Sequence, residues 1–376
     1  MEYKEMMRKK EKTGKGNFFG TLIHTERIAQ GIKPEQLAEG LYSPSMIKKI
    51  ERGERFPEKL MRNRLLARLG IYDFCCEQYV FQEEYENWKL RTKVFFALQE
   101  NALETAEQLL MQSKIKQTEN KAEAQFFLVM QLWLMQKKQL QKSIWLPVLE
   151  QAIRLTVPQF RKKPLTKLVL SAEERYLLEK YYFYEETAWN EEMVYQEVDY
   201  SCFYDKNEAY CINFVIRARR KMFGLKRKEL EHICSQRTLR RIENGSGKIQ
   251  FFIAEALLQK VGISMELQKN SLQNQQYIVC EEVRRLWDNG VISKTVYLQR
   301  LKEILEMSIP LEVALQAIQD RCMPNGRKQA GEKYLTMQEV IILELLAKET
   351  MELEQRNRYQ NALEEYAVWK KNRMEE

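Results

Sequence analysis

The chain has 376 residues, of which 44% are hydrophobic, 11% aromatic and 30% charged, and its formal net charge is +8. This length predicts two or more domains, and the apolar and aromatic content excludes a disordered chain. No apolar run approaches membrane-spanning length, and the charged first dozen residues lack the apolar stretch of a signal peptide, so we expect a cytoplasmic protein without membrane contact.

The positive charge is concentrated in two segments. Residues 1–70 carry 16 basic and 9 acidic side chains, and residues 206–263 carry 13 and 5. The remaining residues carry 32 basic and 39 acidic side chains, so their net charge is negative. A generally basic surface would spread its charge evenly. Concentration in two segments is what binding to nucleic-acid phosphates requires.

Residues 1–19 begin with six basic side chains and two glycines, which predicts a flexible basic arm. Two roles for this arm stay open. Basic termini are commonly only solvated, and some basic arms enter a DNA groove.

Residues 20–71 carry the start and stop signals of several short helices. A helix opened by Pro34 ends at Gly40, since proline loses no hydrogen bond in a first turn and glycine tolerates the left-handed conformation of a turn. Ser43 then provides an N-cap for a helix that runs to about Arg52. Two short helices joined by a tight turn predict a helix-turn-helix DNA-binding domain.

On the second of these helices Ile47 and Ile50 lie three residues apart, so we expect both to face the core. The candidate DNA contacts are the outward side chains Ser45, Met46, Lys48, Lys49 and Arg52. The three cations would bind phosphates, Ser45 and Lys49 would reach base edges, and the methionine would meet a thymine methyl. The alternative is a helix face that is merely solvated.

From Ile71 to Gly224 the sequence has no internal glycine and only three prolines, and it is rich in Leu, Glu, Gln, Lys and Ala. This composition is hard to build as anything but helices. Ser171-Ala172-Glu173-Glu174 has the form of a capping motif that opens a helix. We predict stacked, tetratricopeptide-like helical hairpins over residues 72–205, although a clean period of about 34 residues is missing.

A second segment, residues 206–263, repeats the first. Leu37 aligns with Leu230 at an offset of 193 residues, and Glu51 aligns with Glu243 at an offset of 192, because the second segment lacks one turn residue. An alignment with one deletion over about fifty residues predicts an internal duplication.

The second segment carries its own candidate DNA contacts, Ser235, Arg237, Thr238, Arg240 and Arg241. Arg240 and Arg241 would bind phosphates, Arg237 and Arg241 would reach base edges, and Thr238 would meet a thymine methyl. Two interpretations stay open, DNA binding and a degenerate structural or dimerisation module. If both segments bind, one chain covers two half-sites about 34 Å apart.

Residues 264–376 are expected to be helical again. Leu335-Thr336-Met337-Gln338-Glu339 matches Leu170-Ser171-Ala172-Glu173-Glu174 at an offset of 165 residues, so a weaker duplication extends to the helical regions. The predicted fold is all-α, with two small helix-turn-helix domains of the five-helix type alternating with stacked helical-hairpin regions.

Catalysis and metal binding find little support. The seven cysteines form no C-x-x-C pair and the chain has two histidines, His24 and His232, so neither a zinc site nor a catalytic triad is expected. Adjacent Cys75 and Cys76 leave a redox sensor as the alternative to buried, reduced thiols. Gly245-Ser246-Gly247-Lys248 lacks the glycine spacing and preceding strand of a phosphate-binding loop. We predict no cofactor, no metal and no enzymatic activity.

At these two segments the chain resembles the Cro/C1-type (XRE) helix-turn-helix family. The resemblance implies a structural ion pair between an arginine on the first helix and a glutamate that ends the recognition helix, namely Arg27 with Glu51 and Arg220 with Glu243. It also implies base-edge contacts near the following residues: Ser43, Ser45 and Lys49, and Ser235, Arg237 and Arg241.

A helix-turn-helix domain followed by stacked helices resembles the peptide-sensing regulators of low-GC Gram-positive bacteria, the Rgg and PlcR type. This resemblance implies a transcriptional regulator that binds double-stranded DNA, with a helical region that dimerises the protein and binds a short peptide effector. The second helix-turn-helix segment departs from that layout and leaves the homodimer and the peptide open. The alternative is a protein-interaction scaffold in which both segments are structural, and the salt dependence of DNA binding separates the two.

Overall fold

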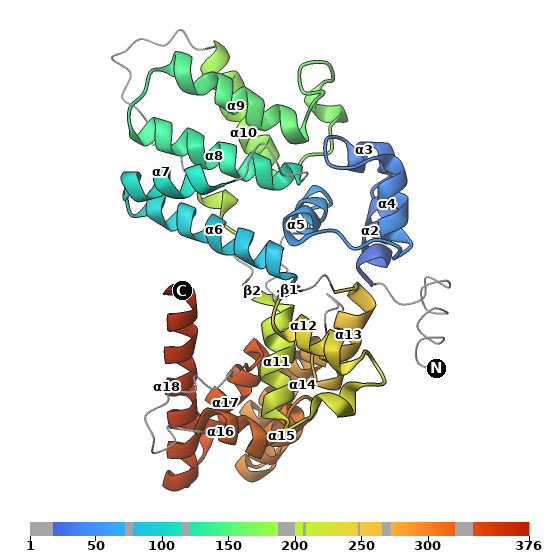
Figure 1. Ribbon diagram of the computed structural model, residues 1–376, viewed down its shortest axis with the longest axis vertical. Coiled ribbons are helices and arrows are strands. Elements are labelled where there is room, and N and C mark those ends of the chain that lie inside the picture. Colours follow the sequence, from blue (N-terminus) through green and yellow to red (C-terminus); the bar gives the residue numbers. More distant parts are fainter. Residues whose placement is uncertain are drawn as a thin grey trace. The chain divides into compact units, whose positions relative to one another are not determined.

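The computed structural model describes residues 18–71, 78–113, 120–186, 200–205, 208–246, 249–264, 272–319 and 334–375. Residues 1–17 of the predicted arm lie outside this part of the chain, as do Cys75 and Cys76, Gly247 and Lys248. Helices account for most of the described residues (Figure 1), so the predicted helical class is confirmed.

The chain forms two compact units. Among the described residues, the N-terminal unit contains those up to 71 and those from 83 to 208. The C-terminal unit contains residues 78–82 and everything from 209 onward. A short stretch that follows the first four helices therefore belongs to the C-terminal unit, before the chain returns to the N-terminal unit.

The N-terminal unit begins with four short helices, called here the α2–α5 segment. Ser43 and Pro44 open the third of them as the sequence predicts, and the isoleucines at 47 and 50 are both buried. The helices are α2 (Phe18–Ala29), α3 (Pro34–Ala38), α4 (Pro44–Glu51) and α5 (Lys59–Arg68).

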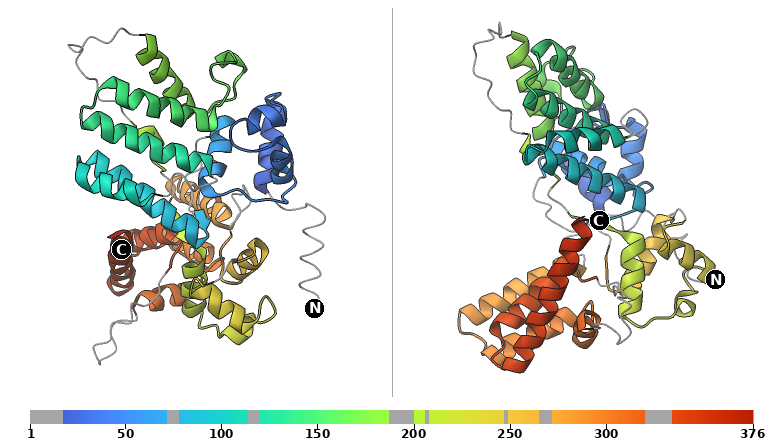
Figure 2. Two further views of the ribbon diagram at one scale, coloured as in Figure 1. Left: turned by 45° about the horizontal axis from the view of Figure 1, so that its top comes forward. Right: turned by 60° about the vertical axis from the view of Figure 1, so that its left-hand side comes forward.

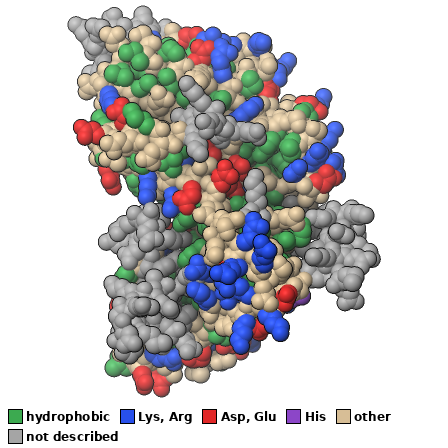
Figure 3. Space-filling view, in the orientation of Figure 1, with side chains coloured by type: hydrophobic (Ala, Val, Ile, Leu, Met, Phe, Trp, Pro, Cys, Tyr) green, Lys and Arg blue, Asp and Glu red, His purple; other side chains and the backbone are tan. Residues whose placement is uncertain are grey.

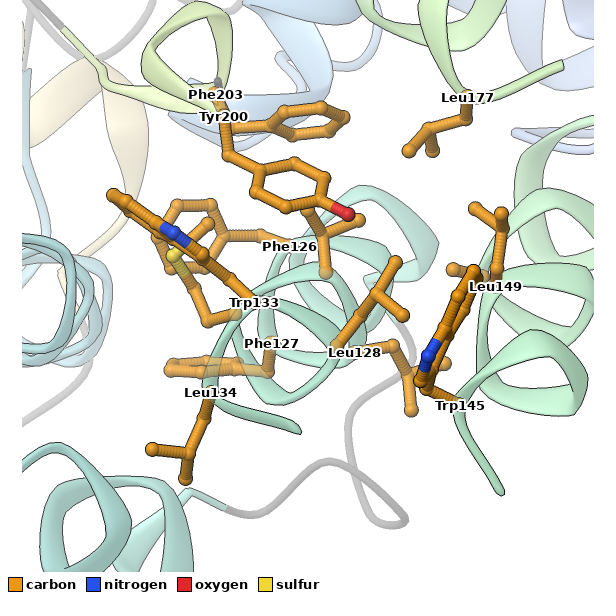
Figure 4. Packing of buried hydrophobic residues seen from close by; sticks show 14 of the residues in the cluster. Phe126, Phe127, Leu128, Trp133, Leu134, Trp145, Leu149, Leu177, Tyr200 and Phe203 are labelled. Atoms are coloured by element: carbon orange, nitrogen blue, oxygen red, sulfur yellow. The ribbon is translucent and has the colours of Figure 1, made fainter. Parts of the chain in front are cut away.

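The rest of the N-terminal unit is built from packed helices. Helix α7 contacts α8, and α9 contacts both α8 and α10. The most extensive contact is that of α8 with α9, which lie side by side in each view (Figures 1 and 2). The core between them holds aromatic side chains from α8 and α9 together with Leu177 of α10, Tyr200 and Phe203 (Figure 4). The elements are α6 (Gln82–Gln99), α7 (Leu103–Gln112), α8 (Lys121–Lys137), α9 (Lys142–Thr156), η2 (Leu165–Lys167), α10 (Ala172–Glu186) and η3 (Ser201–Phe203).

The C-terminal unit contains a two-stranded parallel sheet, which corrects the all-α prediction at one point. In β1 (Gln78–Val80) and β2 (Ala209–Cys211), Tyr79 lies opposite Tyr210. The hydroxyl of Tyr334 donates to that of Tyr79 at 3.0 Å, so the three tyrosines pack together. Each strand has three residues, which is too short for an alternating pattern to be visible in the sequence.

After β2 follow α11, a 3₁₀ turn η4, α12 and α13, called here the α11–α13 segment, which shares one apolar core with the tyrosines. Five further helices with a separate apolar core complete the described part of the unit. The helices are α11 (Ile212–Met222), η4 (Arg227–Leu230), α12 (Gln236–Glu243), α13 (Phe251–Lys260), α14 (Leu272–Asp288), α15 (Lys294–Glu306), α16 (Leu311–Gln319), α17 (Met337–Glu349) and α18 (Leu353–Glu375).

Candidate nucleic-acid interface

Helix α4 is closed at both ends by local chemistry. The Ser43 hydroxyl accepts a hydrogen bond from the Met46 backbone N–H at 3.3 Å, which satisfies one of the amides that a helix N-terminus leaves unpaired. At the other end Gly53 has φ +73°, a conformation that glycine adopts without a steric penalty. The helix is therefore eight residues long, with a defined inner and outer face.

The outer face of α4 carries the predicted DNA contacts. Ser45, Lys48, Lys49 and Arg52 are exposed, and Met46 is half-buried. Lys48 and Lys49 make no hydrogen bond or close ion pair to another described residue. Arg52 differs, because its guanidinium donates to both carboxylate oxygens of Glu54 at 2.6 and 3.1 Å. A phosphate would have to compete with Glu54 for Arg52.

The inner side of α4 is tied to α2 by the Arg27 guanidinium, which donates to both carboxylate oxygens of Glu51 at 2.6 and 3.1 Å. Arg27 also donates to the carbonyl of Ile32, and His24 lies 3.1 Å from the same carboxylate. Burial by itself would raise the pKa of Glu51, but the hydrogen bonds from Arg27 and His24 outweigh burial and hold that pKa below its ordinary value. The carboxylate therefore stays charged and fixes α4 against α2.

Helix α12 has the same local design. The Ser235 hydroxyl accepts from the Thr238 backbone N–H at 3.2 Å, and Leu239 and Ile242 are buried. The predicted contacts Arg237, Thr238, Arg240 and Arg241 are all exposed. None of the three arginine side chains makes a hydrogen bond or ion pair to a described residue, so all three are available to an anion.

Glu243 at the end of α12 is fully buried and holds two arginines. Arg220 of α11 donates to its two oxygens at 2.5 and 3.3 Å, and Arg227 of η4 donates at 2.8 Å. Arg220 also donates to the carbonyl of Leu225, which is the position equivalent to Ile32. The family resemblance named Arg220. It did not point to Arg227, because the equivalent position in the first segment is Pro34.

Basic side chains gather in the same places on the surface. Figure 3 shows Lys and Arg over the α11–α12 face of the C-terminal unit and over α4 in the N-terminal unit. Among the described residues there is no group of three or more His, Cys, Asp and Glu side chains able to hold a metal ion. Over the same part of the chain, no helix is both long and apolar enough to cross a bilayer.

Sequence reasoning also missed two buried ion pairs beside these segments. Arg68 donates to both oxygens of Glu174 at 2.9 and 2.7 Å, and Arg219 donates to both oxygens of Glu339 at 2.9 and 3.0 Å. The capping motifs at 171 and 336 mark both glutamates in the sequence. Their arginine partners could not be predicted, because a capping glutamate is commonly solvated and then needs no cation.

No protein-family model matches the chain, and no curated protein matches it. Among solved structures, the chain aligns with PlcR of Bacillus thuringiensis, crystallised with the peptide PapR7 and DNA. The alignment covers 94% of this chain and 96% of that chain at 12% identity, with a TM-score of 0.20. A score this low assigns neither an arrangement of domains nor a partner to this chain.

Proposed function

We propose that the chain is a sequence-specific transcriptional regulator that binds double-stranded DNA through α4 and α12. In this proposal the α2–α5 segment and the α11–α13 segment are two helix-turn-helix domains. The helical parts α6–α10 and α14–α18 support them. A homodimer and a short peptide effector are the further partners that the family resemblance adds.

The proposal rests on α4 and α12, two short helices whose exposed faces carry cations without close partners among the described residues. Each helix starts at a capping serine, buries two aliphatic side chains and ends at a glutamate that a buried arginine holds. A protein surface normally pairs or scatters its charges. Two lysines on α4 and three arginines on α12 lack close partners among the described residues, as cations that bind phosphates and base edges would.

A protein-interaction scaffold is the second candidate, and exposed apolar side chains favour it. On α14, Tyr277, Ile278, Val279 and Leu286 are at least one-third exposed, and three of them are consecutive. Single exposed apolar residues need no explanation, but a run of them is typical of surfaces that contact protein.

Binding to random-sequence duplex DNA at several salt concentrations tests the proposal. We expect the logarithm of the affinity to fall linearly as the logarithm of the salt concentration rises, because each phosphate contact releases counterions. Repeated selection from a random pool should then enrich one sequence. Binding that is weak, insensitive to salt and without an enriched sequence would instead support the scaffold.

A further inference from the structure

Each unit attaches its short-helix segment at a site of the same design. In the N-terminal unit, Gln125 donates to the Ala152 carbonyl and the Thr156 hydroxyl near the end of α9. In the C-terminal unit, Gln276 donates to the Ile304 carbonyl and the Ser308 hydroxyl near the end of α15. Val-Pro follows Thr156 and Ile-Pro follows Ser308, so the two helix ends also correspond in sequence.

A capping box then places a buried glutamate beside each helix end. Glu174 accepts from the Ser171 backbone N–H while its own N–H donates to the Ser171 hydroxyl, and Glu339 has the same two bonds with Thr336. Both carboxylates are fully buried. A buried carboxylate needs a cation, so each of these sites requires an arginine from outside the helix.

The arginines come from different places. In the N-terminal unit Arg68 of α5 binds Glu174, the Thr156 carbonyl and the carbonyl of Leu37 in α3. In the C-terminal unit Arg219 of α11 binds Glu339 and the carbonyl of Val261 after α13, and reaches the Ser308 carbonyl at 3.4 Å. The position equivalent to Arg68 is the exposed Lys260, and the position equivalent to Arg219 is the half-buried Glu26.

The glycines that closely approach the two helix ends also come from different places in the two segments. A Cβ atom added at Gly40 would lie 1.9 Å from the Thr156 carbonyl oxygen, and one added at Gly262 would lie 2.1 Å from the Ser308 carbonyl oxygen. Gly40 has no equivalent in the α11–α13 segment. Gly70, the equivalent of Gly262, would meet nothing within 4 Å. The two segments therefore pack on equivalent sites with different faces, and α4 and α12 are presented differently by their units.

The exposed faces of α4 and α12 also differ in chemistry. Where α4 has Ser45, Met46 and Lys49, α12 has Arg237, Thr238 and Arg241 at the aligned positions. Arginine binds the O6 and N7 of guanine through two hydrogen bonds, whereas serine and lysine discriminate less sharply.

Building on the proposed function, we propose that the DNA site of this chain consists of two unlike half-sites that are not an inverted repeat. The half-site under α12 contains guanines bound by Arg237 and Arg241. An inverted repeat suits two identical recognition helices related by a two-fold axis. Here the exposed residues of α4 and α12 differ, and the two segments pack on their units with different faces. The two half-sites therefore differ in sequence.

Selection from a random duplex pool with three full-length proteins tests this inference. The proteins are the wild type, Arg237→Ala with Arg241→Ala, and Lys48→Ala with Lys49→Ala. We expect the wild type to enrich two dissimilar elements. The arginine variant should lose only the guanine-containing element and the lysine variant only the other, each with a fall in affinity for the wild-type site of roughly 5- to 150-fold per lost base contact.

Matched controls remove two exposed positive charges from the helical part of each unit: Arg284→Ala with Arg300→Ala, and Lys93→Ala with Lys121→Ala. Both controls should enrich the wild-type site. An enriched inverted repeat of one element, or a site that either recognition-helix variant leaves unchanged, overturns the inference while the proposed DNA binding stands. The absence of any enriched sequence overturns the proposed function itself.

Discussion

The N-terminal and C-terminal units each contain a buried carboxylate at an equivalent place. In each unit an arginine pairs with it, but the two arginines come from different helices. Glu174 and Glu339 stand at equivalent places in equivalent capping boxes, yet Arg68 comes from the fourth helix of its segment and Arg219 from the first helix of its own. The requirement for a cation is thus kept, whereas the position that supplies it is not. A buried carboxylate therefore determines that an arginine must bind at the docking site. It does not determine in which orientation the short-helix segment packs there.

The largest effect is expected from removing one of these arginines. Arg219→Met leaves Glu339 buried without its cation, which should cost the C-terminal unit about 3–5 kcal/mol of unfolding free energy. Hydrogen exchange resolved by segment should show the loss in α11–α18 and leave α2–α10 protected as in wild type. Arg68→Met should produce the reverse pattern with a smaller loss, because the Arg64 guanidinium still lies 4.0 Å from the Glu174 carboxylate.

The double variant Arg219→Met with Glu339→Met is the control for this prediction, because replacing both charges by apolar groups should recover most of the loss. Equal loss of protection in both units after either single change would show that the two docking sites are not independent.

The two aligned glycines provide the next comparison. Gly70 and Gly262 have nearly the same φ, +75° and +74°, so alanine meets the same backbone strain at both, about 1–2 kcal/mol. At Gly262 the added methyl also collides with the Ser308 carbonyl. We expect Gly262→Ala to cost about 1–3 kcal/mol more than Gly70→Ala in chemical denaturation. Equal costs would contradict the assignment of different docking faces.

The arginines that hold α4 and α12 should differ in a smaller way. Arg27→Ala leaves Glu51 only His24, so we expect a loss of about 2–3 kcal/mol in the α2–α5 segment and no change in α6–α10. Arg220→Ala leaves Glu243 paired with Arg227, so its cost should be smaller. Thermal unfolding of the two variants checks this order. A profile for Arg27→Ala identical to wild type would count against a stabilising role for the Arg27–Glu51 pair.

A further difference between the two units is expected at alkaline pH. Burial lowers the pKa of Lys59 to about 8 despite the nearby Asp205, so above pH 8 the unfolded chain binds a proton that the folded chain does not. The unfolding free energy of the N-terminal unit should therefore rise from pH 8 towards 10.5 through this group.

Burial has the opposite consequence for Cys280, because it raises the pKa of this thiol from 9.0 to about 11. The stability that Cys280 contributes to the C-terminal unit is present below pH 9 and lost as pH rises towards 11. Hydrogen exchange resolved by segment and measured between pH 8 and 10.5 should thus show stability that rises with pH in the N-terminal unit and falls above pH 9 in the C-terminal unit. Lys59→Met should flatten the first slope and Cys280→Ala the second. Parallel slopes in wild type would refute the prediction.

Much of the local structure was readable in the sequence because it depends on neighbouring residues. Pro34, Ser43 and Pro44 predict where α3 and α4 begin, and the spacing of Ile47 and Ile50 predicts which face of α4 is buried. The helical class follows from a long stretch without glycine. The three-residue strands could not be foreseen, since they exist through pairing between Tyr79 and Tyr210, far apart in the chain.

The sequence by itself determined the helix ends, the alignment of the two segments and the concentration of basic residues in them, because caps, turns and charge are local properties. Only the tertiary structure decided which arginine reaches which buried glutamate. Arg68 and Glu174 lie 106 residues apart, and Arg219 and Glu339 lie 120 apart. A contact over such a distance depends on how whole helices pack, and the same sequence positions, Glu26 and Lys260, do not make it in the other unit.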